Sequence, residues 1–478
     1  MSEFAAAPPA AAGAPVQPMT VAASDPVIPA VAGMPANPNS EILTAKLQKL
    51  AMDRQKGNLA ERLKIIQSNT ASHLASLTTF QEMQLPPHLL SGIFGMGFDK
   101  PSAIQAYALP RILAEPPQSL IAQAQSGSGK TAAFVLGMLY RVTVDTPCTT
   151  QALCVTPTRE LAVQIVQNCL VKMAANITGL RTRMALAGEM IDRGETANAH
   201  IVVGTPGKVC DWLKRKMINA KTIKVLVLDE ADEMCNESSH RANSLLIRKA
   251  VGPQCQTLFF SATFPGPVLE YAEKLAGECD KILIASDEEL VLDEIKQIWI
   301  DTEAYAGGKL KFLEDMYSLM TIGQSIVFVE SRREVDAVAK TLNDQGFACS
   351  ALHGKIENEQ RDALMNSFRN GETQVLITTN VLARGVDVDN VCLVVNYDMP
   401  KIMNMDRNAP IIPDYETYLH RIGRTGRFGK KGTAINLVSD MPNKQLLAQI
   451  EQHFSPNKEM IQLCKPDAEA LADMLEVS

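Results

Sequence analysis

The sequence has no C-x-x-C pair among its ten cysteines, which lie scattered from Cys148 to Cys464. Zinc sites and disulfide frameworks usually need closely paired cysteines, so this spacing argues against both and indicates reduced, buried thiols. No apolar run is long enough to span a bilayer, and membrane insertion is not expected. The first residues, MSEFAAAPPAAAGAPVQP, lack the basic and leucine-rich segments of a signal peptide. We therefore expect a protein of the cytoplasm or the nucleus.

An excess of positive charge is also missing. The 478 residues carry a formal net charge of −7, so the overall charge does not indicate nucleic-acid binding. Any site for a polyanion must therefore be local. The chain is long enough for more than one domain, and its composition, 46% hydrophobic and 21% charged, is ordinary for a soluble globular protein.

The N-terminal part of the chain changes character near residue 40. Residues 1 to about 40 are mostly Ala, Pro, Gly and Val without periodicity, which predicts a disordered tail. The next segments, SEILTAKLQKLAMDRQ (40–55) and NLAERLKIIQ (58–67), are amphipathic and predict helices. Amphipathicity cannot distinguish a solvated linker helix from a docked regulatory helix, so both interpretations of residues 40–68 stay open. We assign residues 1–75 to this extension.

The rest of the chain alternates short apolar runs with helical patterns. Such alternation predicts parallel sheets covered by helices on both faces. The pattern restarts after the acidic segment ASDEELVLDEIKQ (285–297), the expected interdomain hinge. We predict two α/β domains, residues 76–288 and 289–478. Strands are expected at SLIAQA (119–124), ALCVTP (152–157), IVVGTP (201–206), KVLVLD (224–229) and QTLFFSAT (256–263) in the first domain, and at SIVFVES (325–331), ACSALHG (348–354), QVLITTN (374–380), CLVVNYD (392–398) and TAINLVS (433–439) in the second.

A loop rich in glycine and serine, AQSGSGKT (124–131), follows one of these strands and precedes a helical pattern. This is the context of a phosphate-binding P-loop, although a chance turn followed by a lysine would look similar. Small residues let backbone N–H groups close on phosphate oxygens at a helix N-terminus. Lys130 would reach the β- and γ-phosphates of ATP, and the Thr131 hydroxyl would join a Mg²⁺ shell. Ala124 replaces the usual first glycine of such loops.

A second candidate site follows another strand, at VLDEAD (227–232). The carboxyl ends of parallel strands share one edge of the sheet, so these acids should emerge beside the P-loop. Asp229 could hold Mg²⁺ through water, and Glu230 could orient and polarise an attacking water molecule. Acids at a helix N-terminus are also a common stabilising device, and only the pairing with a P-loop favours the catalytic interpretation.

Other motifs are ambiguous when each is taken alone. PTREL (157–161), TPGK (205–208) and SAT (261–263) end strands, where hydroxyl groups also serve as ordinary caps and turns. The segment HRIGRTGRFG (420–429) places three arginines three residues apart in an acidic chain. Arginine forms forked contacts with phosphate or carboxylate, so this segment predicts either an anion contact or a surface network of ion pairs.

Taken in order, the motifs resemble the DEAD-box ATP-dependent RNA helicases. The series is GFDKPSAIQ (97–105), AQSGSGKT, PTRELA, TPGK, LDEAD, SAT, SIVFVES, TTNVLARGVDV (378–388) and HRIGRTGR, and it spans roughly residues 76–478. The resemblance implies two tandem RecA-like P-loop domains, with ATP and Mg²⁺ as cofactors and single-stranded RNA as substrate. It also implies that Arg424 and Arg427 act as arginine fingers, which neutralise charge on the phosphoryl group held by the first domain.

The resemblance assigns roles residue by residue. The catalytic set is Glu230, Lys130, Arg424 and Arg427, and the metal set is Thr131 and Asp229. Nucleotide contacts would come from Phe80, Gln105, Ser126, Gly127, Ser128, Gly129, Lys130, Thr131, Gly385 and Asp387. RNA contacts would come from Thr158, Arg159, Gly188, Thr205, Gly207, Arg332, Arg361 and Thr378. Ser261, Thr263, Asp232 and His420 would couple nucleotide state to domain closure. Phe80 would stack on the adenine, although taken alone it is more typical of a core residue.

Three positions depart from the family pattern. A glycine pair of the family appears as Gly188 followed by Glu189, which places a carboxylate near the expected RNA path. Lys208 replaces the arginine that closes the TPGR motif, and Asn358 stands where glutamine is usual. These departures bear on RNA affinity and not on ATP hydrolysis.

Several longer segments resemble the nuclear-pore mRNA-export subgroup of the family. They include LAEPPQSLIAQAQSGSGKTAAFVLGML, the long polar insertion after NYDMP (401–414) and the closing IEQHF segment. The resemblance implies mRNA–protein complexes as substrates, nuclear-pore activating factors as partners, and a monomer in the nucleus and cytoplasm. In that subgroup the N-terminal extension can restrain domain closure, a role for which residues 40–68 are a candidate.

Alternative functions remain at this point. A DEAD-box helicase of translation initiation, or a slowly hydrolysing ATP-dependent RNA clamp, would share most of these residues. A DNA helicase or translocase would not be expected to bring the whole motif series. A scaffold built on inactive RecA-like domains would be expected to show eroded motifs, and none is visible.

Overall fold

The computed structural model describes residues 63–66, 77–144, 147–192, 194–236, 238–284, 294–320, 322–380, 390–402, 411–426, 431–457 and 459–476. Its strands form two large sheets and one two-stranded sheet, and all of them belong to one unit of the chain, residues 47–478. The predicted tail and the predicted helix at 40–55 lie outside the described residues. In the described part, no helix has the length and apolar character needed to cross a membrane.

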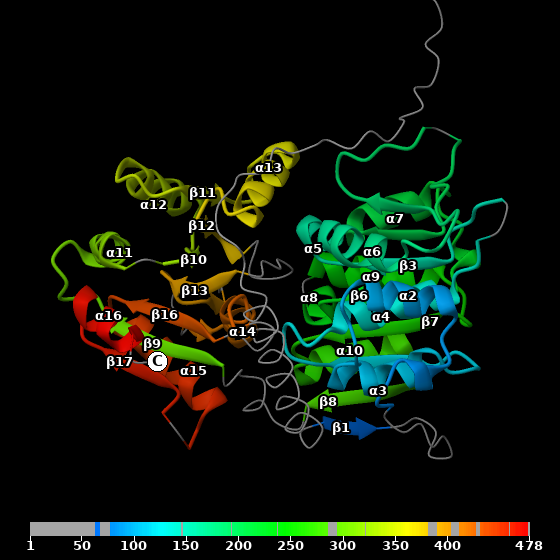
Figure 1. Cartoon of the computed structure of the whole chain (residues 1–478), viewed down its shortest axis with the longest axis horizontal. Helices are drawn as coiled ribbons and strands as arrows, with labels where there is room; N and C mark the ends of the chain where they lie inside the picture. Colours follow the sequence, from blue (N-terminus) through cyan, green and yellow to red (C-terminus); the bar gives the residue numbers. More distant parts are fainter. Residues whose placement is uncertain are drawn as a thin grey trace, which may run out of the picture. The chain divides into compact units, whose positions relative to one another are not determined.

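The first large sheet has eight strands in the order β1-β8-β2-β7-β6-β3-β5-β4 (Figure 1). Seven strands run parallel, and only β1 is antiparallel to its neighbour. Their near-continuous apolar runs are those expected of strands buried on both faces. The strands are β1 (Leu63–Ile66), β2 (Ser119–Gln123), β3 (Ala152–Val155), β4 (Thr182–Ala185), β5 (Ile201–Gly204), β6 (Val225–Asp229), β7 (Gln256–Ser261) and β8 (Cys279–Ile284).

Alternate strand residues of this sheet enter two separate cores. Leu120 and Ala122 pack with the helices from α2 to α6, whereas Ile121 packs with the helices from α7 to α10 on the opposite face. The sheet is therefore covered on both faces, as predicted. The first set comprises α2 (Pro87–Gly95), α3 (Ala103–Ile112), α4 (Lys130–Arg141), α5 (Arg159–Gln164), its continuation η2 (Ile165–Leu170) and α6 (Val171–Met173); the second comprises α7 (Pro206–Lys214), α8 (Ala231–Asn236), α9 (Ser238–Ala250) and α10 (Gly266–Ala276).

Strand β1 corrects one prediction. The segment 58–67 was expected to be helical, but Leu63–Ile66 is a strand whose register pairs Leu63 with Ile284 and Ile66 with Lys281 (Figure 1). Without β1, strand β8 would be an edge with a row of unpaired N–H and C=O groups. Pairing with this edge overrides the helical pattern, and the two adjacent isoleucines suit a strand.

The second large sheet has seven parallel strands in the order β11-β12-β10-β13-β16-β9-β17. Helices α11, α12 and α16 cover one face, and α13, α14 and α15 cover the other. The strands are β9 (Ile295–Asp301), β10 (Gln324–Phe328), β11 (Cys349–Leu352), β12 (Val375–Thr378), β13 (Val391–Asn396), β16 (Gly432–Val438) and β17 (Ile461–Cys464); the helices are α11 (Gly308–Leu319), α12 (Arg332–Asp344), α13 (Asn358–Arg369), α14 (Tyr415–Ile422), α15 (Met441–Phe454) and α16 (Ala468–Glu476).

All ten predicted strands are present, and the predicted pair of RecA-like domains is confirmed. Besides β1, four strands of the two large sheets were missed: β4, β8, β9 and β17. The last residues of the predicted hinge, 295–297, belong to β9, while 285–293 lie outside the described residues. The polar insertion begins and ends in a small two-stranded sheet of β14 (Lys401–Ile402) and β15 (Ile412–Pro413).

Candidate nucleotide and RNA site

The P-loop connects β2 to α4 at the carboxyl edge of the first sheet. Gly127 and Gly129 have φ of +74° and +96°, backbone conformations that favour glycine. A Cβ on Gly129 would also lie 2.6 Å from the Gln105 side-chain nitrogen. That nitrogen donates a hydrogen bond to the Gly129 carbonyl oxygen over 3.1 Å. Gln105 is therefore positioned on the P-loop, where the sequence predicted a nucleotide contact.

Lys130, the first residue of α4, folds its ammonium group back onto the loop. The Nζ atom donates to the carbonyl oxygens of Ala124 and Gln125, the latter at 3.1 Å. Burial lowers the pKa of Lys130, and the nearby charges of Glu230 and Asp229 oppose that shift. A partly buried cation that donates to carbonyl oxygens is suited to exchanging those partners for phosphate oxygens.

The acidic pair lies at the end of β6 beside this lysine. Burial, reinforced by the charge of Glu230, raises the pKa of Asp229 to about 8. Glu230 adopts a left-handed backbone conformation with φ of +49°, rare for a non-glycine residue, and its N–H donates to Asp229 Oδ1 over 3.0 Å. Closely spaced carboxylate oxygens are the ligands that Mg²⁺ prefers, so Asp229 fits a magnesium–nucleotide complex. Such an ion would supply charge neutralisation at the β- and γ-phosphates.

Asp232 ties the acidic motif to the SAT motif after β7. Its two carboxylate oxygens accept hydrogen bonds from Ser261 Oγ at 2.8 Å and Thr263 Oγ1 at 3.0 Å. All three side chains are buried. The predicted coupling residues of the first domain therefore form one hydrogen-bonded group.

Residues of α14 and the following loop approach this site from the second domain. His420 Nε2 lies 3.6 Å from Asp232 Oδ2 and 3.8 Å from Glu230 Oε2. Arg424 NH2 donates to the hydroxyl of Ser126 in the P-loop over 3.3 Å, and its Nε donates to the His420 carbonyl oxygen. One predicted arginine finger thus contacts the phosphate-binding loop of the other domain.

Arg421 has a different environment from Arg424. Its guanidinium donates to the side-chain oxygens of Asn380 and Asn396 and to the Asp398 carbonyl oxygen. The group stacks over Phe328, with 5.0 Å between the guanidinium carbon and the ring centre. Burial lowers the pKa of Arg421 to about 10. This arginine faces the protein interior and not the nucleotide.

The predicted RNA contacts of the first domain lie on the loops after β3, β4 and β5. Thr158 caps α5 by accepting a hydrogen bond from Leu161 N–H, Thr205 precedes α7, and Gly188 has φ of +93°. Gly207 is exposed, and a Cβ there would meet no atom within 4 Å. These groups share the sheet edge that carries the P-loop, as the topology requires.

Two ion pairs join this region to α13 of the second domain. Arg361 NH2 lies 2.5 Å from Glu160 Oε1, and Arg159 NH2 lies 2.8 Å from Asp362 Oδ2. Asn358 donates a hydrogen bond to the Ala187 carbonyl oxygen. Two of the three arginines predicted to contact RNA, Arg159 and Arg361, are therefore held across the two domains by carboxylates.

Comparisons with known proteins agree with this geometry. A family model described as DEAD/DEAH box helicase matches residues 102–271, and one described as Helicase conserved C-terminal domain matches residues 308–429. ATP-dependent RNA helicase DBP5 of Meyerozyma guilliermondii is 42% identical over 394 residues, covering 82% of this chain and 79% of the relative. ATP-dependent RNA helicase DDX19A of Homo sapiens is 42% identical over 401 residues, covering 84% and 82%.

The chain belongs to the DEAD-box family of ATP-dependent RNA helicases.

A solved structure agrees over both domains of this DEAD-box chain. The structure described as "S. cerevisiae Dbp5 bound to RNA and ADP BeF3" matches with a TM-score of 0.77 and 38% identity, covering 84% of this chain and 98% of that one. This agreement supports an ATP-binding helicase core with two tandem RecA-like domains.

Some of the remaining predicted site residues are not described by the structure, and others differ in how far they are buried. Gly385, Asp387 and Arg427 lie outside the described residues. Phe80 is only 2% exposed and packs in the core of the first domain, as its sequence context alone suggested. In the second domain Thr378 is buried at the end of β12, and Arg332 is exposed at the start of α12.

Sequence reasoning missed three positioning side chains. Asn380 is the double acceptor for Arg421, and Asp362 is the partner of Arg159. Gln123, the last residue of β2, donates to the Ala262 carbonyl oxygen and accepts from Ile284 N–H. For Gln123, a polar residue at the end of a buried strand was the available signal, because a buried amide needs specific partners.

Proposed function

We propose that this chain is an RNA-stimulated ATPase that clamps single-stranded RNA between its two domains and remodels RNA duplexes or RNA–protein complexes in nuclear mRNA export. The observation that carries the proposal is the hydrogen bond from Arg424 of the second domain to Ser126 of the P-loop. Because residues of both domains meet at the nucleotide loop, nucleotide binding favours the closed arrangement.

The residues of the site have separate roles in binding and hydrolysing ATP. Gln105 and the P-loop bind and orient the nucleotide, and Lys130 exchanges its carbonyl partners for phosphate oxygens. Glu230 accepts hydrogen bonds from the attacking water and orients it. Arg424 and Arg427 neutralise the charge that develops on the transferred phosphoryl group. Asp229 and Thr131 would hold Mg²⁺.

RNA binding depends on the same closure. Thr158, Arg159, Gly188, Thr205 and Gly207 of the first domain and Arg332, Arg361 and Thr378 of the second would contact the sugar–phosphate backbone. Such contacts carry no base information, so binding is tolerant of sequence. Since RNA and ATP both favour closure, each strengthens the binding of the other. A strand bent between the domains cannot stay paired, and its partner strand or a bound protein is expelled.

The export assignment rests on the relatives. Solved neighbours include structures described as "S. cerevisiae dbp5 l327v bound to gle1 h337r and ip6", at 38% identity, and "S. cerevisiae dbp5 l327v bound to nup159, gle1 h337r, ip6 and adp", at 36% identity. We propose counterparts of these two proteins as partners of this chain, and a monomer that acts at the nuclear pore and in the adjoining cytoplasm and nucleus.

Steady-state ATP hydrolysis tests the proposal. We expect strong stimulation by single-stranded RNA, none by DNA of the same sequence, and loss of activity in Glu230→Gln. Equal stimulation by DNA would contradict the assignment to RNA. A Glu230→Gln variant as active as the natural chain would contradict the role of Glu230. Addition of the Gle1 counterpart should accelerate turnover if the export assignment is correct.

A further inference from the structure

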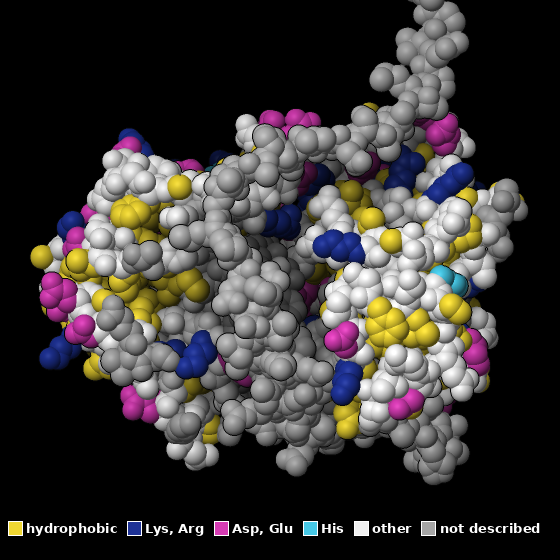
Figure 2. All heavy atoms as spheres, viewed as in Figure 1, with side chains coloured by type: hydrophobic (Ala, Val, Ile, Leu, Met, Phe, Trp, Pro, Cys, Tyr) yellow, Lys and Arg dark blue, Asp and Glu magenta, His cyan; other side chains and the backbone are white. Residues whose placement is uncertain are grey.

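The segment from Lys208 to Lys224 is strongly basic in an otherwise acidic chain. It contains six Lys or Arg residues and one Asp, whereas the whole chain has a net charge of −7. On the face of the molecule in Figure 2, basic and acidic side chains are interspersed, so a concentration of cations in one segment is unusual. We name Lys214, Arg215, Lys216, Lys221 and Lys224, all of which are exposed, the basic strip.

Helix α7 connects the proposed RNA contact at Thr205 to the basic strip. Helix α7 begins directly after Thr205, and its nine residues carry the chain about 13 Å from that end to Lys214. The strip continues through Lys216 to the start of β6, at the opposite edge of the sheet from the nucleotide. A strand of RNA that leaves the clamp beside Thr205 and follows α7 would reach these cations.

Four of the five charges of the basic strip are available for a ligand. Arg215 is paired with Asp211 over 2.7 Å. Among the described residues, no carboxylate pairs with Lys214, Lys216, Lys221 or Lys224; the Lys224 ammonium donates only to the Thr143 hydroxyl, over 3.3 Å. In the clamp itself, by contrast, Arg159 and Arg361 are each held by a carboxylate.

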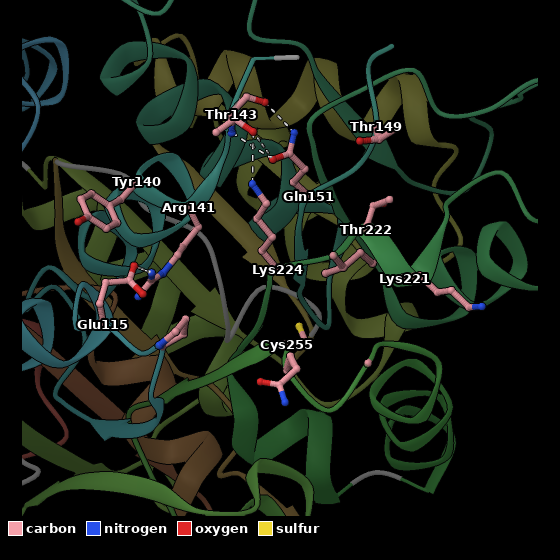
Figure 3. Close-up of a pocket in the computed structure, with 14 residues that line it drawn as sticks. Glu115, Tyr140, Arg141, Thr143, Thr149, Gln151, Lys221, Thr222, Lys224 and Cys255 are labelled. Atoms are coloured by element: carbon pink, nitrogen blue, oxygen red, sulfur yellow. Dashed lines mark hydrogen bonds and ion pairs between the residues drawn. The ribbon is translucent and has the colours of Figure 1, made fainter. Parts of the chain in front are cut away.

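The far end of the strip borders a hollow of about 660 Å³ at the base of the first domain (Figure 3). Its walls are fixed by hydrogen bonds, such as those from Gln151 to the Thr143 carbonyl oxygen and from Thr222 to the Thr150 carbonyl oxygen. Thr143, Thr149, Thr222 and Tyr140 are among the residues that line it. Hydroxyls that bond phosphates, cations and an aromatic face are the combination found in sites for single-stranded nucleic acid.

The directions of the basic side chains favour an extended polyanion over a compact anion. Arg141 lines the hollow but is committed to Glu115 and to the carbonyl oxygens of Ile112 and Ala114. The Lys224 side chain turns toward Thr143, whereas Lys221 points away from the hollow (Figure 3). Divergent ammonium groups cannot converge on one compact anion, but they suit successive phosphates of an extended backbone.

A protein partner fits the strip less well. Specific protein interfaces depend on buried apolar or aromatic anchors at their centre. The large apolar residues between Lys214 and Lys224, Met217, Ile218 and Ile223, are buried in the core of the first domain. The strip therefore offers charge without an apolar anchor.

We propose that the basic strip and the adjoining hollow form a second RNA site, which holds the part of the strand that leaves the clamp. This inference rests on the proposed function, because it requires RNA in the clamp. It predicts that the chain binds long single-stranded RNA more tightly than RNA that fills only the clamp. The added contact is with phosphates and is independent of base sequence.

RNA affinity as a function of length tests the proposal. Fluorescently labelled oligonucleotides from about 6 to about 30 nucleotides would be titrated with the full chain and a non-hydrolysable ATP analogue. The test variant is Lys214→Gln, Lys221→Gln, Lys224→Gln. The control variant is Lys172→Gln, Lys249→Gln, Lys274→Gln, which removes three exposed lysines from other helices of the same domain.

We expect the test variant to bind the longest RNA at least about 10-fold more weakly than the natural chain. The slope of log affinity against log salt concentration should become shallower by about 2. Affinity for the shortest RNA that binds should stay unchanged, and the control variant should match the natural chain. Equal losses of affinity for short and long RNA would overturn the second site. No loss at all would also overturn it, and is the result expected if the strip binds an acidic protein instead. If the natural chain bound no RNA of any length, the proposed function itself would fail.

Discussion

The Arg361 guanidinium of α13 and the Glu160 carboxylate of α5 lie 2.5 Å apart and are 13% and 3% exposed. They come from different domains, and Arg159 and Asp362 form a second ion pair beside them. Removing Arg361 leaves the Glu160 carboxylate buried without its ion-pair partner in the closed arrangement. Each pair therefore contributes to closure and not to the folding of either domain.

Arg361→Gln should weaken RNA binding in the presence of an ATP analogue by about 100-fold, because an unpaired buried carboxylate costs about 3 kcal/mol or more. The double variant Arg361→Gln, Glu160→Gln should recover part of the loss. A double-mutant cycle of RNA affinity measures the coupling. Additive effects of the two substitutions would show that the pair does not act as a unit.

The pH dependence of stability tests the environment of Asp229. Its pKa is raised from 3.8 to about 8, so the folded chain holds a proton that the unfolded chain releases above 3.8. The stability that this proton gives is complete below 3.8 and is lost as the pH rises through about 8. Asp229→Asn removes the effect.

We therefore expect the Tm of Asp229→Asn, relative to the natural chain, to rise between pH 6 and pH 8 by the equivalent of about 2 kcal/mol in unfolding free energy. The measurement is thermal unfolding without nucleotide or divalent cation. A difference in Tm that stays constant over this range would contradict the raised pKa.

Arg421 should gain from a charged partner. Both its Nε and NH2 groups donate to the single side-chain oxygen of Asn380, at 3.0 and 2.5 Å. Asn380→Asp would supply a forked carboxylate to a guanidinium that is already buried. The unfolding free energy of the second domain should rise by about 1–2 kcal/mol, measured by urea denaturation. Unchanged or lower stability would show that these two groups do not meet. Asn380→Leu is the matched variant that should destabilise.

Ser261 and Thr263 should stabilise the first domain through Asp232. Replacing both by Ala removes two hydrogen bonds to a buried carboxylate, which costs about 3–5 kcal/mol. Chemical denaturation of the double variant measures the loss. Asp232→Asn, which keeps one acceptor oxygen, should lose less. Equal stability of the double variant and the natural chain would contradict the hydrogen bonds at 2.8 and 3.0 Å.

Strand β1 must be kept in any truncated chain used to test whether the N-terminal extension inhibits activity. A chain starting at Ser76 lacks Leu63–Ile66 and leaves the edge of β8 unpaired. We expect that chain to aggregate more and to melt lower than a chain starting at Gly57, measured by light scattering and thermal unfolding. Inhibition by residues 40–55 is therefore tested with the chain that starts at Gly57. Equal behaviour of the two truncated chains would show that β1 does not protect the edge.

The sequence was sufficient to predict strands and site residues where the local pattern agrees with the global fold. Continuous apolar runs such as 225–229 predicted buried parallel strands, and the residues after them predicted the site, because parallel strands share a carboxyl edge. The strand at Leu63–Ile66 was not predictable, since its partner β8 lies more than 200 residues further along the chain. The roles of Asn380 and Asp362 were likewise hidden, because each depends on an arginine that only the tertiary structure brings near.

The central claim is that ATP and RNA each close the same two domains. Its most direct test is the affinity for single-stranded RNA measured without nucleotide, with ADP and with a non-hydrolysable ATP analogue. We predict that the analogue tightens RNA binding by about 10-fold or more relative to the nucleotide-free chain, and that RNA tightens binding of the analogue by the same factor. RNA affinity that is identical in all three conditions would contradict the claim.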